Sequence, residues 1–330
     1  MKEILNELIN HRSLTKETAK KVLVELTSGK FNPSQTAAFM TVYMMRSITV
    51  DELQGFRDAM LEQCLRVDFD QPVMDVCGTG GDGKNTFNLS TLSAFVIAAA
   101  GQPVAKHGNY GVSSACGSSN VMEFFGYKFT NNLDALKRSL DAANICFMHA
   151  PLFHPAMKNV APIRKDLGVK TFFNMLGPLV NPALPTRQLV GVFNLELARQ
   201  FGYLYQNSNK QFAIVHSVHG FDEVSLTGPI KVFDNEGEKM ITPKDFDLPV
   251  LRYEDILGGD TIEDAAQIFI AVLEGRAKPA QNHAVVANAA MGLHAANQKQ
   301  DIREAVALAR EALDSGKALA TFKKLLDNQN

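Results

Sequence analysis

The chain has 330 residues, of which 46% are apolar and 21% are charged, an ordinary balance for a globular protein. Its 33 basic and 35 acidic side chains leave a net charge of −2, so composition gives no support for a broad nucleic-acid-binding surface. No run approaches the roughly 18 apolar residues of a membrane span. The first nine positions carry acids among their apolar residues, unlike a secretory signal, so we expect a cytoplasmic protein outside the membrane.

The length exceeds that of a usual single hydrophobic core, so we expect two domains, or one large α/β domain with a helical appendage. The four cysteines, Cys64, Cys77, Cys116 and Cys146, show neither close pairing nor the spacing of a metal site. They are expected to be reduced thiols that pack as small apolar side chains.

The first 66 residues carry apolar side chains at helical spacing, for example Leu53, Phe56 and Met60, and little that favours strand. Thr15 and Asn32 each precede such a run and are residue types that begin helices. We therefore predict an N-terminal helical domain at 1–66, which helices near 160–185 are candidates to complete. Several amphipathic helices without a full core also suggest that part of their apolar surface meets another domain or subunit.

From about residue 70 onward, short apolar and β-branched runs alternate with helical stretches. The strand-like runs lie at 73–77, 104–107, 145–148, 189–193 and 212–216, and a helix is expected from about Ser90 to Ala100. Such alternation is typical of a parallel α/β sheet. A hairpin is predicted at 231–242 and further helices between 260 and 328, so we assign 70–330 to one large α/β domain.

The densest glycine cluster lies at 75–86, DVCGTGGDGKNT, and is followed by NLST at 88–91. Glycine allows successive backbone N–H groups to turn toward one anion, because no side chain intervenes. A helix that begins just afterwards adds its positive end to the same point. The segment therefore predicts a binding site for a phosphate compound.

The glycine loop alone does not identify that compound. Gly78 to Gly83 satisfies G-x-G-x-x-G, but the segment about 20 positions on, 101–107, is basic where a dinucleotide site needs an acid. Gly78 to Lys84 also satisfies G-x-x-x-x-G-K, but Asn85 stands where a P-loop has Ser or Thr. A purely structural turn is a further alternative.

Six more motifs follow the glycine loop. They are KHGNYGVSS at 106–114, GSSNVME at 117–123, HPAMK at 154–158, APIRKDLG at 161–168, NMLGPLVNP at 174–182 and HGFDE at 219–223. In this order, and nearly end to end, the chain resembles the anthranilate phosphoribosyltransferase family. The resemblance implies the fold of class II nucleoside phosphorylases, also called the class IV phosphoribosyltransferase type. That fold has a small all-helical domain and a large α/β domain, with the active site in the cleft between them.

The resemblance also implies an activity. Members of this family transfer the phosphoribosyl group of 5-phosphoribosyl 1-pyrophosphate (PRPP) to the amine of anthranilate, in the second committed step of tryptophan biosynthesis. The products are N-(5-phosphoribosyl)anthranilate and pyrophosphate, and the reaction depends on Mg²⁺. We therefore expect a magnesium-dependent pentosyltransferase with small-molecule substrates, acting as a homodimer joined through its helical domain.

The family pattern assigns eighteen positions to PRPP. They are Gly78, Gly81, Asp82, Thr86, Asn88, Leu89, Ser90, Thr91, Lys106, His107, Gly108, Asn109, Tyr110, Gly111, Val112, Ser113, Ser114 and Ser118. Lys106 is expected to act as a movable cation in a loop, with serine hydroxyls and backbone N–H groups as further donors.

The same pattern assigns Ser90, Asp222 and Glu223 to two Mg²⁺ ions per active site. Hydroxyl and carboxylate oxygens suit a hard cation that keeps several waters.

Anthranilate is expected to bind through Arg164, whose planar guanidinium fits a carboxylate. Gly78, Asn109, His107 and His154 are the other positions that the resemblance places near this substrate. No protein general base is assigned, because the amine of anthranilate is already nucleophilic.

Two departures from the family pattern concern charge. Many members carry arginine after Lys-His-Gly-Asn and lysine shortly after the paired serines, whereas this chain has Tyr110 and Ala115. The expected consequence is a change in the strength of PRPP binding rather than in the reaction.

Two other functions fit parts of the pattern. A pyrimidine nucleoside phosphorylase of the same fold would not need Asp222 and Glu223 for magnesium, and a nucleic-acid-binding relative would need a basic surface. The acidic pair and the balanced charge both favour the transferase.

Overall fold

The structure, a computed structural model, describes residues 1–111 and 115–329. It consists of two compact units, each formed by two stretches of the chain. Met1–Val67 with Ala150–Pro182 forms what we call the helical unit, and Asp68–His149 with Ala183–Asn330 forms the α/β unit. Among the described residues, no helix combines the length and the apolar character that a membrane crossing requires.

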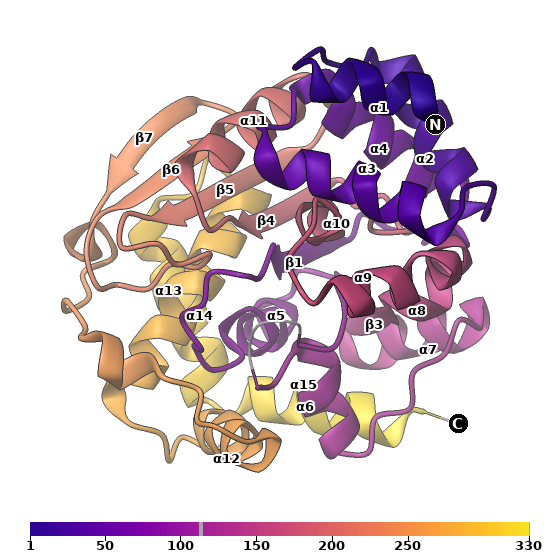
Figure 1. The fold of residues 1–330 in the computed structure, drawn as a ribbon. Helices are drawn as coiled ribbons and strands as arrows, with labels where there is room; N and C mark the ends of the chain where they lie inside the picture. Colours follow the sequence, from indigo (N-terminus) through magenta and orange to yellow (C-terminus); the bar gives the residue numbers. More distant parts are fainter. Residues whose placement is uncertain (112–114, 330) are drawn as a thin grey trace. The chain divides into compact units, whose positions relative to one another are not determined.

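The helical unit contains nine short or medium helices within its described residues (Figure 1). They are α1 (Lys2–Ile9), α2 (Lys16–Thr27), α3 (Pro33–Met45), α4 (Val50–Glu62), α8 (Ala150–Phe153), η1 (Pro155–Asn159), α9 (Ala161–Leu167), α10 (Phe173–Leu176) and η2 (Gly177–Leu179). Both predicted helix starts are confirmed. The Thr15 hydroxyl accepts the N–H of Thr18, and Asn32 exchanges hydrogen bonds with Gln35 across the first turn of α3.

Aromatic rings form the centre of the helical unit. Phe56 of α4 stacks on Phe172 with 4.6 Å between ring centroids, and Phe39 and Tyr43 of α3 meet the same pair edge-on. Buried aromatic pairs of this kind add to the stability from area burial alone. Because Phe172 comes from the second stretch of the unit, this cluster joins α10 to the N-terminal helices.

The α/β unit is built on one seven-stranded sheet with the strand order β3-β2-β1-β4-β5-β6-β7. The strands are β1 (Met74–Gly78), β2 (Val104–Gly108), β3 (Ile145–His149), β4 (Arg187–Gly191), β5 (Gln211–Ser217), β6 (Ile230–Asp234) and β7 (Gly237–Ile241). The first five run parallel, and β6 and β7 form an antiparallel hairpin at one edge. The predicted parallel sheet and hairpin are both confirmed, with strand ends displaced by one or two residues.

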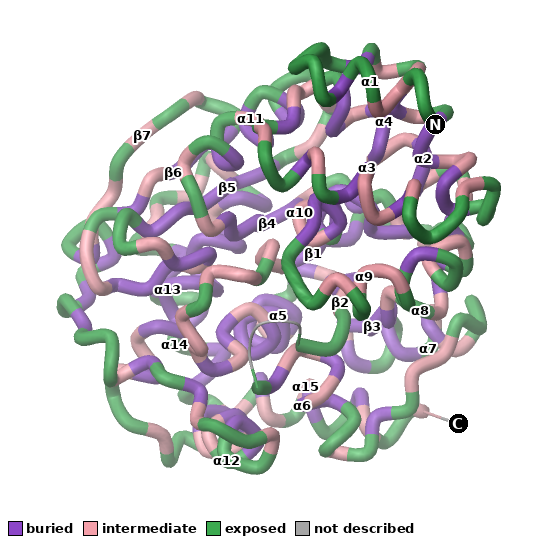
Figure 2. The backbone as a smooth tube through the Cα atoms, viewed as in Figure 1, coloured by how far each residue is buried: buried purple, intermediate pink, exposed green. Residues whose placement is uncertain are grey.

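Helices connect the strands and continue the chain after them. They are α5 (Leu89–Ala99), α6 (Ser118–Phe124), α7 (Leu133–Ala143), α11 (Leu195–Gln206), η3 (Pro243–Phe246), η4 (Tyr253–Ile256), α12 (Ile262–Leu273), α13 (Pro279–Ala296), α14 (Ile302–Asp314) and α15 (Lys317–Asp327). Figure 2 shows that α5, α13 and the central strands are largely buried. Both helices are apolar on nearly every face, as expected of helices inside a core.

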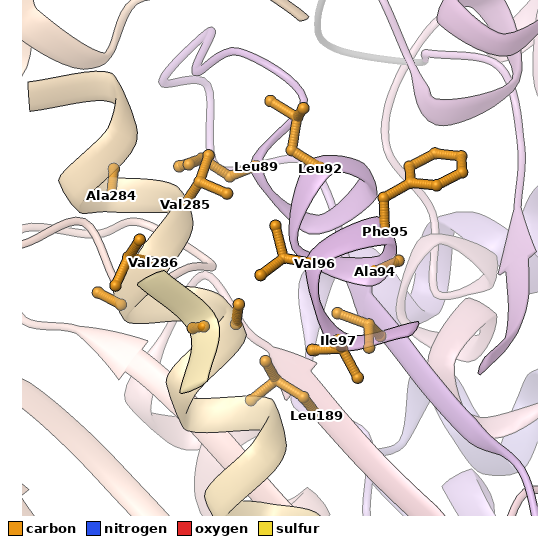
Figure 3. Close-up of a cluster of buried hydrophobic side chains, with 14 of the residues drawn as sticks. Leu89, Leu92, Ala94, Phe95, Val96, Ile97, Leu189, Ala284, Val285 and Val286 are labelled. Carbon is orange, nitrogen blue, oxygen red and sulfur yellow. The ribbon is translucent and has the colours of Figure 1, made fainter. Parts of the chain in front are cut away.

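The main core of this unit lies between α5 and α13. Figure 3 shows Leu89, Val96 and Ile97 of α5 lying toward Val285 and Val286 of α13, with Leu189 of β4 beside them, and all of these side chains are buried. This packing fixes the first turn of α5 at the end of the glycine loop. The fold class predicted from the sequence, a small helical domain with a large α/β domain, is confirmed.

Candidate active site

The carboxyl ends of the parallel strands meet at one edge of the sheet, and the candidate residues of the α/β unit gather there. Connections from β1 and β4, which are neighbours, lead away in opposite directions along the sheet. Open α/β sheets bind ligands at such a reversal of strand order. The glycine loop follows β1, and Asp222 and Glu223 follow β5, so both motifs lie beside this point.

The glycine loop takes a backbone path that only glycine follows easily. Gly80, Gly81 and Gly83 have φ values of 66°, 82° and 71°. The N–H of Gly80 donates to Oδ2 of Asp222 at 2.7 Å. A Cβ on Gly78 would lie 2.4 Å from the same oxygen, so this close approach also requires glycine. The loop is therefore shaped around the carboxylate of Asp222.

Three carboxylates converge at this edge, and we call Asp82, Asp222 and Glu223 the acidic cluster. Burial, and then the charge of Asp82, raise the pKa of Asp222 to about 7. Burial, and then the charge of Asp222, raise the pKa of Glu223 well above its usual range. The Thr86 hydroxyl donates to Oε2 of Glu223 at 2.9 Å. One carboxylate oxygen, Oδ2 of Asp82, is buried and accepts no hydrogen bond from the described residues. This excess of negative charge suits a cation.

The donor set of the acidic cluster fits Mg²⁺ better than a transition metal. Within the described residues, no group of three His, Cys, Asp or Glu side chains is close enough to hold a metal by itself. Magnesium commonly binds through one or two carboxylates, with water and substrate phosphate oxygens in the remaining positions. A small cavity lined by Ser90, Asp222, Glu223 and Asn288, among others, lies beside these oxygens.

Lys106 differs from the sequence-based expectation. It lies in strand β2, which agrees with the strand-like run expected at 104–107, but it is only 1% exposed, whereas the family resemblance implied a movable cation in a loop. Its Nζ donates to the carbonyl of Val76 and lies 3.4 Å from Oγ of Ser90. Burial lowers the pKa of Lys106, while the nearby charge of Asp75 acts in the opposite direction. The expectation of a movable loop cation is therefore wrong, because the ammonium group is fixed behind the first turn of α5.

The segment 88–91 begins helix α5. Asn88 is its N-terminal capping residue and donates from Nδ2 to the carbonyl of Cys116 at 3.1 Å, while its buried Oδ1 accepts no hydrogen bond from the described residues. Leu89 and Thr91 are buried, and Ser90 is half-buried. The first N–H groups of a helix of eleven residues are thus directed to the same edge as the glycine loop.

Residues 106–111 and 115–118 comprise the end of β2, the described parts of the connection that follows it and the first residue of α6. The N–H of His107 donates to Asp75 Oδ1 at 3.1 Å, and Ser118 Oγ donates to the carbonyl of Asn109 at 3.2 Å. A Cβ on Gly108 would lie 2.4 Å from that serine hydroxyl, so the two segments touch. The candidates Val112, Ser113 and Ser114 lie outside the described residues.

Tyr110 is one of the two departures in charge from the pattern that the resemblance implies. Its hydroxyl donates to Glu123 Oε1 at 3.1 Å, and its ring meets the imidazole of His149 edge-on at 4.8 Å between centroids. Burial lowers the pKa of His149, which favours its neutral form. The tyrosine therefore contributes contacts to α6 and β3 in place of a positive charge.

Arg164 and His154 belong to the helical unit. His154 precedes η1 and is 4% exposed. Arg164 lies in α9, where its Nη2 donates to Asn174 Oδ1 at 3.3 Å and its Cζ lies 5.3 Å from the ring centroid of Phe173. Burial lowers the pKa of Arg164.

The relatives of this chain agree with these motifs. Residues 70–319 match the family model described as the glycosyl transferase family a/b domain, and residues 2–64 match the helical bundle domain of the same family. The anthranilate phosphoribosyltransferase of Flavobacterium johnsoniae is 59% identical over 98% of both chains. That of Bacteroides fragilis is 52% identical over 99% of both. The chain belongs to the anthranilate phosphoribosyltransferase family.

Solved structures of anthranilate phosphoribosyltransferases share the whole fold. The Thermus thermophilus enzyme superposes with a TM-score of 0.91 at 33% identity and covers 98% of both chains. The Saccharomyces cerevisiae enzyme in complex with PRPP and Mg gives 0.90 at 26% identity, over 98% of this chain and 96% of that one.

Sequence reasoning missed three amide side chains that shape the candidate sites of this phosphoribosyltransferase. Asn288 of α13, which is 3% exposed, accepts the N–H of Val224 and donates to its carbonyl, both at 2.9 Å, and so fixes the residue after Glu223. Asn120 and Asn174 hold other segments in similar ways. Only Asn288 offered a signal in the sequence, as an amide with apolar or alanine neighbours on both sides within the alanine-rich helix α13.

Proposed function

We propose that this protein transfers the phosphoribosyl group of PRPP to the amine of anthranilate, giving N-(5-phosphoribosyl)anthranilate and pyrophosphate in tryptophan biosynthesis. The observation that carries the proposal is family membership together with the acidic pair Asp222 and Glu223 after β5. Asp222 and Glu223 are held there by the glycine loop and by Thr86. A nucleoside phosphorylase of the same fold has no use for such a pair.

PRPP binds, in this proposal, along the edge formed by the glycine loop, the start of α5 and the described residues 106–111 and 115–118. Backbone N–H groups of the glycine loop and of the first turn of α5 bind phosphate oxygens in this proposal, because glycine lets neighbouring N–H groups turn toward one anion and the start of a helix carries partial positive charge. Thr86, Asn88 and Ser118 add polar groups at the same edge. Lys106 contributes a fixed positive charge behind Ser90 rather than a direct clamp.

Ser90, Asp222 and Glu223 are proposed to hold two Mg²⁺ ions together with oxygens of PRPP. When bound, Mg²⁺ stabilises the negative charge that develops on departing pyrophosphate. The acidic cluster holds its carboxylates in place before substrate arrives, so little reorganisation accompanies the reaction. The Saccharomyces cerevisiae enzyme in complex with PRPP and Mg supports the use of magnesium with PRPP.

Arg164 is proposed to bind the carboxylate of anthranilate, with Gly78, His107, Asn109 and His154 as further contacts. Its guanidinium offers paired N–H donors that match a carboxylate. Binding through the carboxylate orients the neighbouring amine, which attacks C1 of the ribose without a protein general base. The yeast enzyme in complex with 4-fluoroanthranilate supports an anthranilate site in this family.

A product assay tests the function. Mixing the protein with Mg²⁺, PRPP and anthranilate should remove anthranilate fluorescence and release one pyrophosphate for each anthranilate consumed. EDTA should stop the reaction, and added Mg²⁺ should restore it. No turnover by a folded sample that instead phosphorolyses a pyrimidine nucleoside would overturn the proposal.

A cytoplasmic homodimer joined through the helical unit completes the proposal. The exposed apolar side chains Ile9, Met44 and Met45 on α1 and α3 support a contact surface on this unit. Light scattering should give twice the chain mass of 36.1 kDa at micromolar concentration. A mass equal to one chain would rule the dimer out.

A further inference from the structure

Arg164 is a half-buried cation, and no carboxylate in the part of the chain that the structure describes pairs with it. None of the ion pairs among the described residues includes it. Burial lowers its pKa, and within residues 1–111 and 115–329 no carboxylate acts in the opposite direction. A desolvated arginine without a counter-charge is costly, and such a cost is usually offset by a ligand or a partner.

Neutral groups hold Arg164 instead. Its Nη2 donates to Asn174 Oδ1 at 3.3 Å, and that oxygen also accepts the N–H of Thr171 at 3.0 Å. The N–H of Asn174 returns to the carbonyl of Thr171 at 3.0 Å, so the acceptor is fixed by its own backbone turn. The guanidinium therefore meets an oxygen whose position does not depend on the ligand.

An aromatic face supports the same guanidinium. Cζ of Arg164 lies 5.3 Å from the ring centroid of Phe173, within the range of a cation–π contact. Phe173 stacks on Phe172 at 4.4 Å, and Phe172 stacks on Phe56 at 4.6 Å. The platform under Arg164 thus extends into the aromatic core of the helical unit and has little freedom to move.

We propose that Asn174 and Phe173 are positioning residues for Arg164, the residue that receives the anthranilate carboxylate. Arginine has five N–H donors, and Asn174 engages Nη2, so the remaining donors are left for a carboxylate. A neutral amide oxygen orients the guanidinium without neutralising it. The inference rests on the proposed function, because it deepens the role of Arg164 in that same site.

The change Asn174→Asp tests whether neutrality matters. An aspartate has nearly the same shape and can still accept the N–H of Thr171, but it places a negative charge beside the guanidinium. It should therefore compete with the substrate carboxylate. We expect the KM for anthranilate to rise at least about tenfold, with kcat at saturating anthranilate and the Kd for PRPP changed less than about twofold.

A second readout separates positioning from loosened structure. Anthranilamide is the neutral carboxamide analogue of anthranilate, so its binding should gain little from an uncompensated arginine. In Asn174→Asp, the preference for anthranilate over anthranilamide in competition binding should fall by about the same tenfold factor. A variant that merely loosened the helical unit would weaken both compounds alike.

The matched control is Asn32→Asp. Asn32 also uses its side-chain oxygen to accept a backbone N–H three residues away, at 2.9 Å, but it caps α3 on the exposed surface. The control makes the same chemical change in the same unit and should leave both KM values unaltered. Its melting temperature provides the reference for Asn174→Asp.

Phe173→Leu provides an independent variant, because leucine keeps the apolar contact and removes the ring face. The KM for anthranilate should rise about twofold to fivefold. If Arg164→Ala raises this KM while both Asn174→Asp and Phe173→Leu leave it unchanged, the positioning role is refuted and the proposed function stands. If wild-type protein forms no product and does not bind anthranilate, the proposed function fails instead.

Discussion

The two candidate binding regions, the acidic cluster of the α/β unit and Arg164 of the helical unit, carry uncompensated charge of opposite sign. In the α/β unit, burial and mutual repulsion raise the pKa of Asp222 and of Glu223. In the helical unit, burial lowers the pKa of Arg164, and no acid among the described residues pairs with it. The first region has negative charge in excess and the second has positive charge in excess. Each lacks what its ligand would supply, a cation in the first case and a carboxylate in the second.

This difference teaches how unpaired charge can mark a binding site. A structural carboxylate in the same chain looks quite different: Glu52 is fully buried and receives hydrogen bonds from Leu14, Tyr43 and Arg46. Hydrogen bonds outweigh the effect of burial there and lower the pKa of Glu52. Buried charged side chains are usually paired in this way. A buried charged side chain without such partners therefore indicates a site where a ligand binds.

The largest effect should come from neutralising the acidic cluster. Asp222→Asn and Glu223→Gln keep the shape of each side chain and remove its charge, so each should lower kcat by about 10² or more, the loss typical of charge stabilisation in a transition state. Steady-state kinetics at saturating Mg²⁺ measures this. Asp245→Asn, which changes a capping acid of η3, serves as a control with normal activity. Full activity in either cluster variant would remove the pair from the mechanism.

Removing the positive charge of Arg164 should have the next largest effect. Arg164→Ala should raise the KM for anthranilate about 10- to 150-fold, corresponding to roughly 1.5–3 kcal/mol for a charged hydrogen-bonded contact. PRPP binding measured by calorimetry should stay nearly intact. Lys106→Met should show the reverse pattern, and methionine is chosen because it fills the buried space. If Arg164→Ala weakens PRPP and spares anthranilate, the arginine belongs to the phosphate region.

The fold was largely predictable because its signals are local. Alternation of strand-like and helical runs gave the parallel strands, and Thr15 and Asn32 marked helix starts that the structure confirms. The sequence could also place motifs at strand ends, since the carboxyl ends of parallel strands share an edge. The resemblance then supplied the ligand that the glycine loop alone left open.

Other features depend on contacts between distant segments and were not predictable. The family motif at 106–114 implied a movable loop cation, whereas Lys106, within the strand expected at 104–107, is buried against β1 and α5. Asn288 lies 64 residues from Val224, and no spacing rule links the two. The partners of Arg164 are similar, because Asn174 and Phe173 reach it only through the turn that begins at Thr171. Amide side chains that contact distant segments in this way have no distinctive sequence pattern.

A neutral residue gives a third, smaller effect. Asn120 Oδ1 accepts the N–H groups of both Gly111 and Gly117, at 2.9 and 3.0 Å, and thereby ties together the two ends of segment 111–117. Asn120→Ala should raise the KM for PRPP about tenfold, since two hydrogen bonds of about 1 kcal/mol each are lost in part. Asn120→Asp keeps the acceptor and should restore most of the affinity. Equal KM values for PRPP in both variants and in wild type would show that these two hydrogen bonds to Asn120 do not contribute to PRPP binding.

The smallest effect concerns the stability of Asp222→Asn. This change should lower activity but raise the melting temperature. The pKa of Asp222 is raised from 3.8 to about 7, so the folded protein holds this proton more tightly than the unfolded chain does. That stabilising contribution is complete below pH 3.8 and is lost as the pH rises toward about 7, because the buried group must then carry a charge. Asparagine does not titrate and keeps the oxygen that accepts the N–H of Gly80.

In EDTA, Asp222→Asn should therefore melt several degrees above wild type at pH 8, and the difference should shrink as the pH falls toward 4. Saturating Mg²⁺ should stabilise wild type but not the variant, because the ion compensates only the carboxylate. Calorimetric scans of both proteins at pH 8 and pH 4, each with and without Mg²⁺, measure these melting temperatures. A variant less stable than wild type at pH 8 in EDTA would show that the charge of Asp222 is already compensated within the protein. The excess of negative charge would then not mark a cation site.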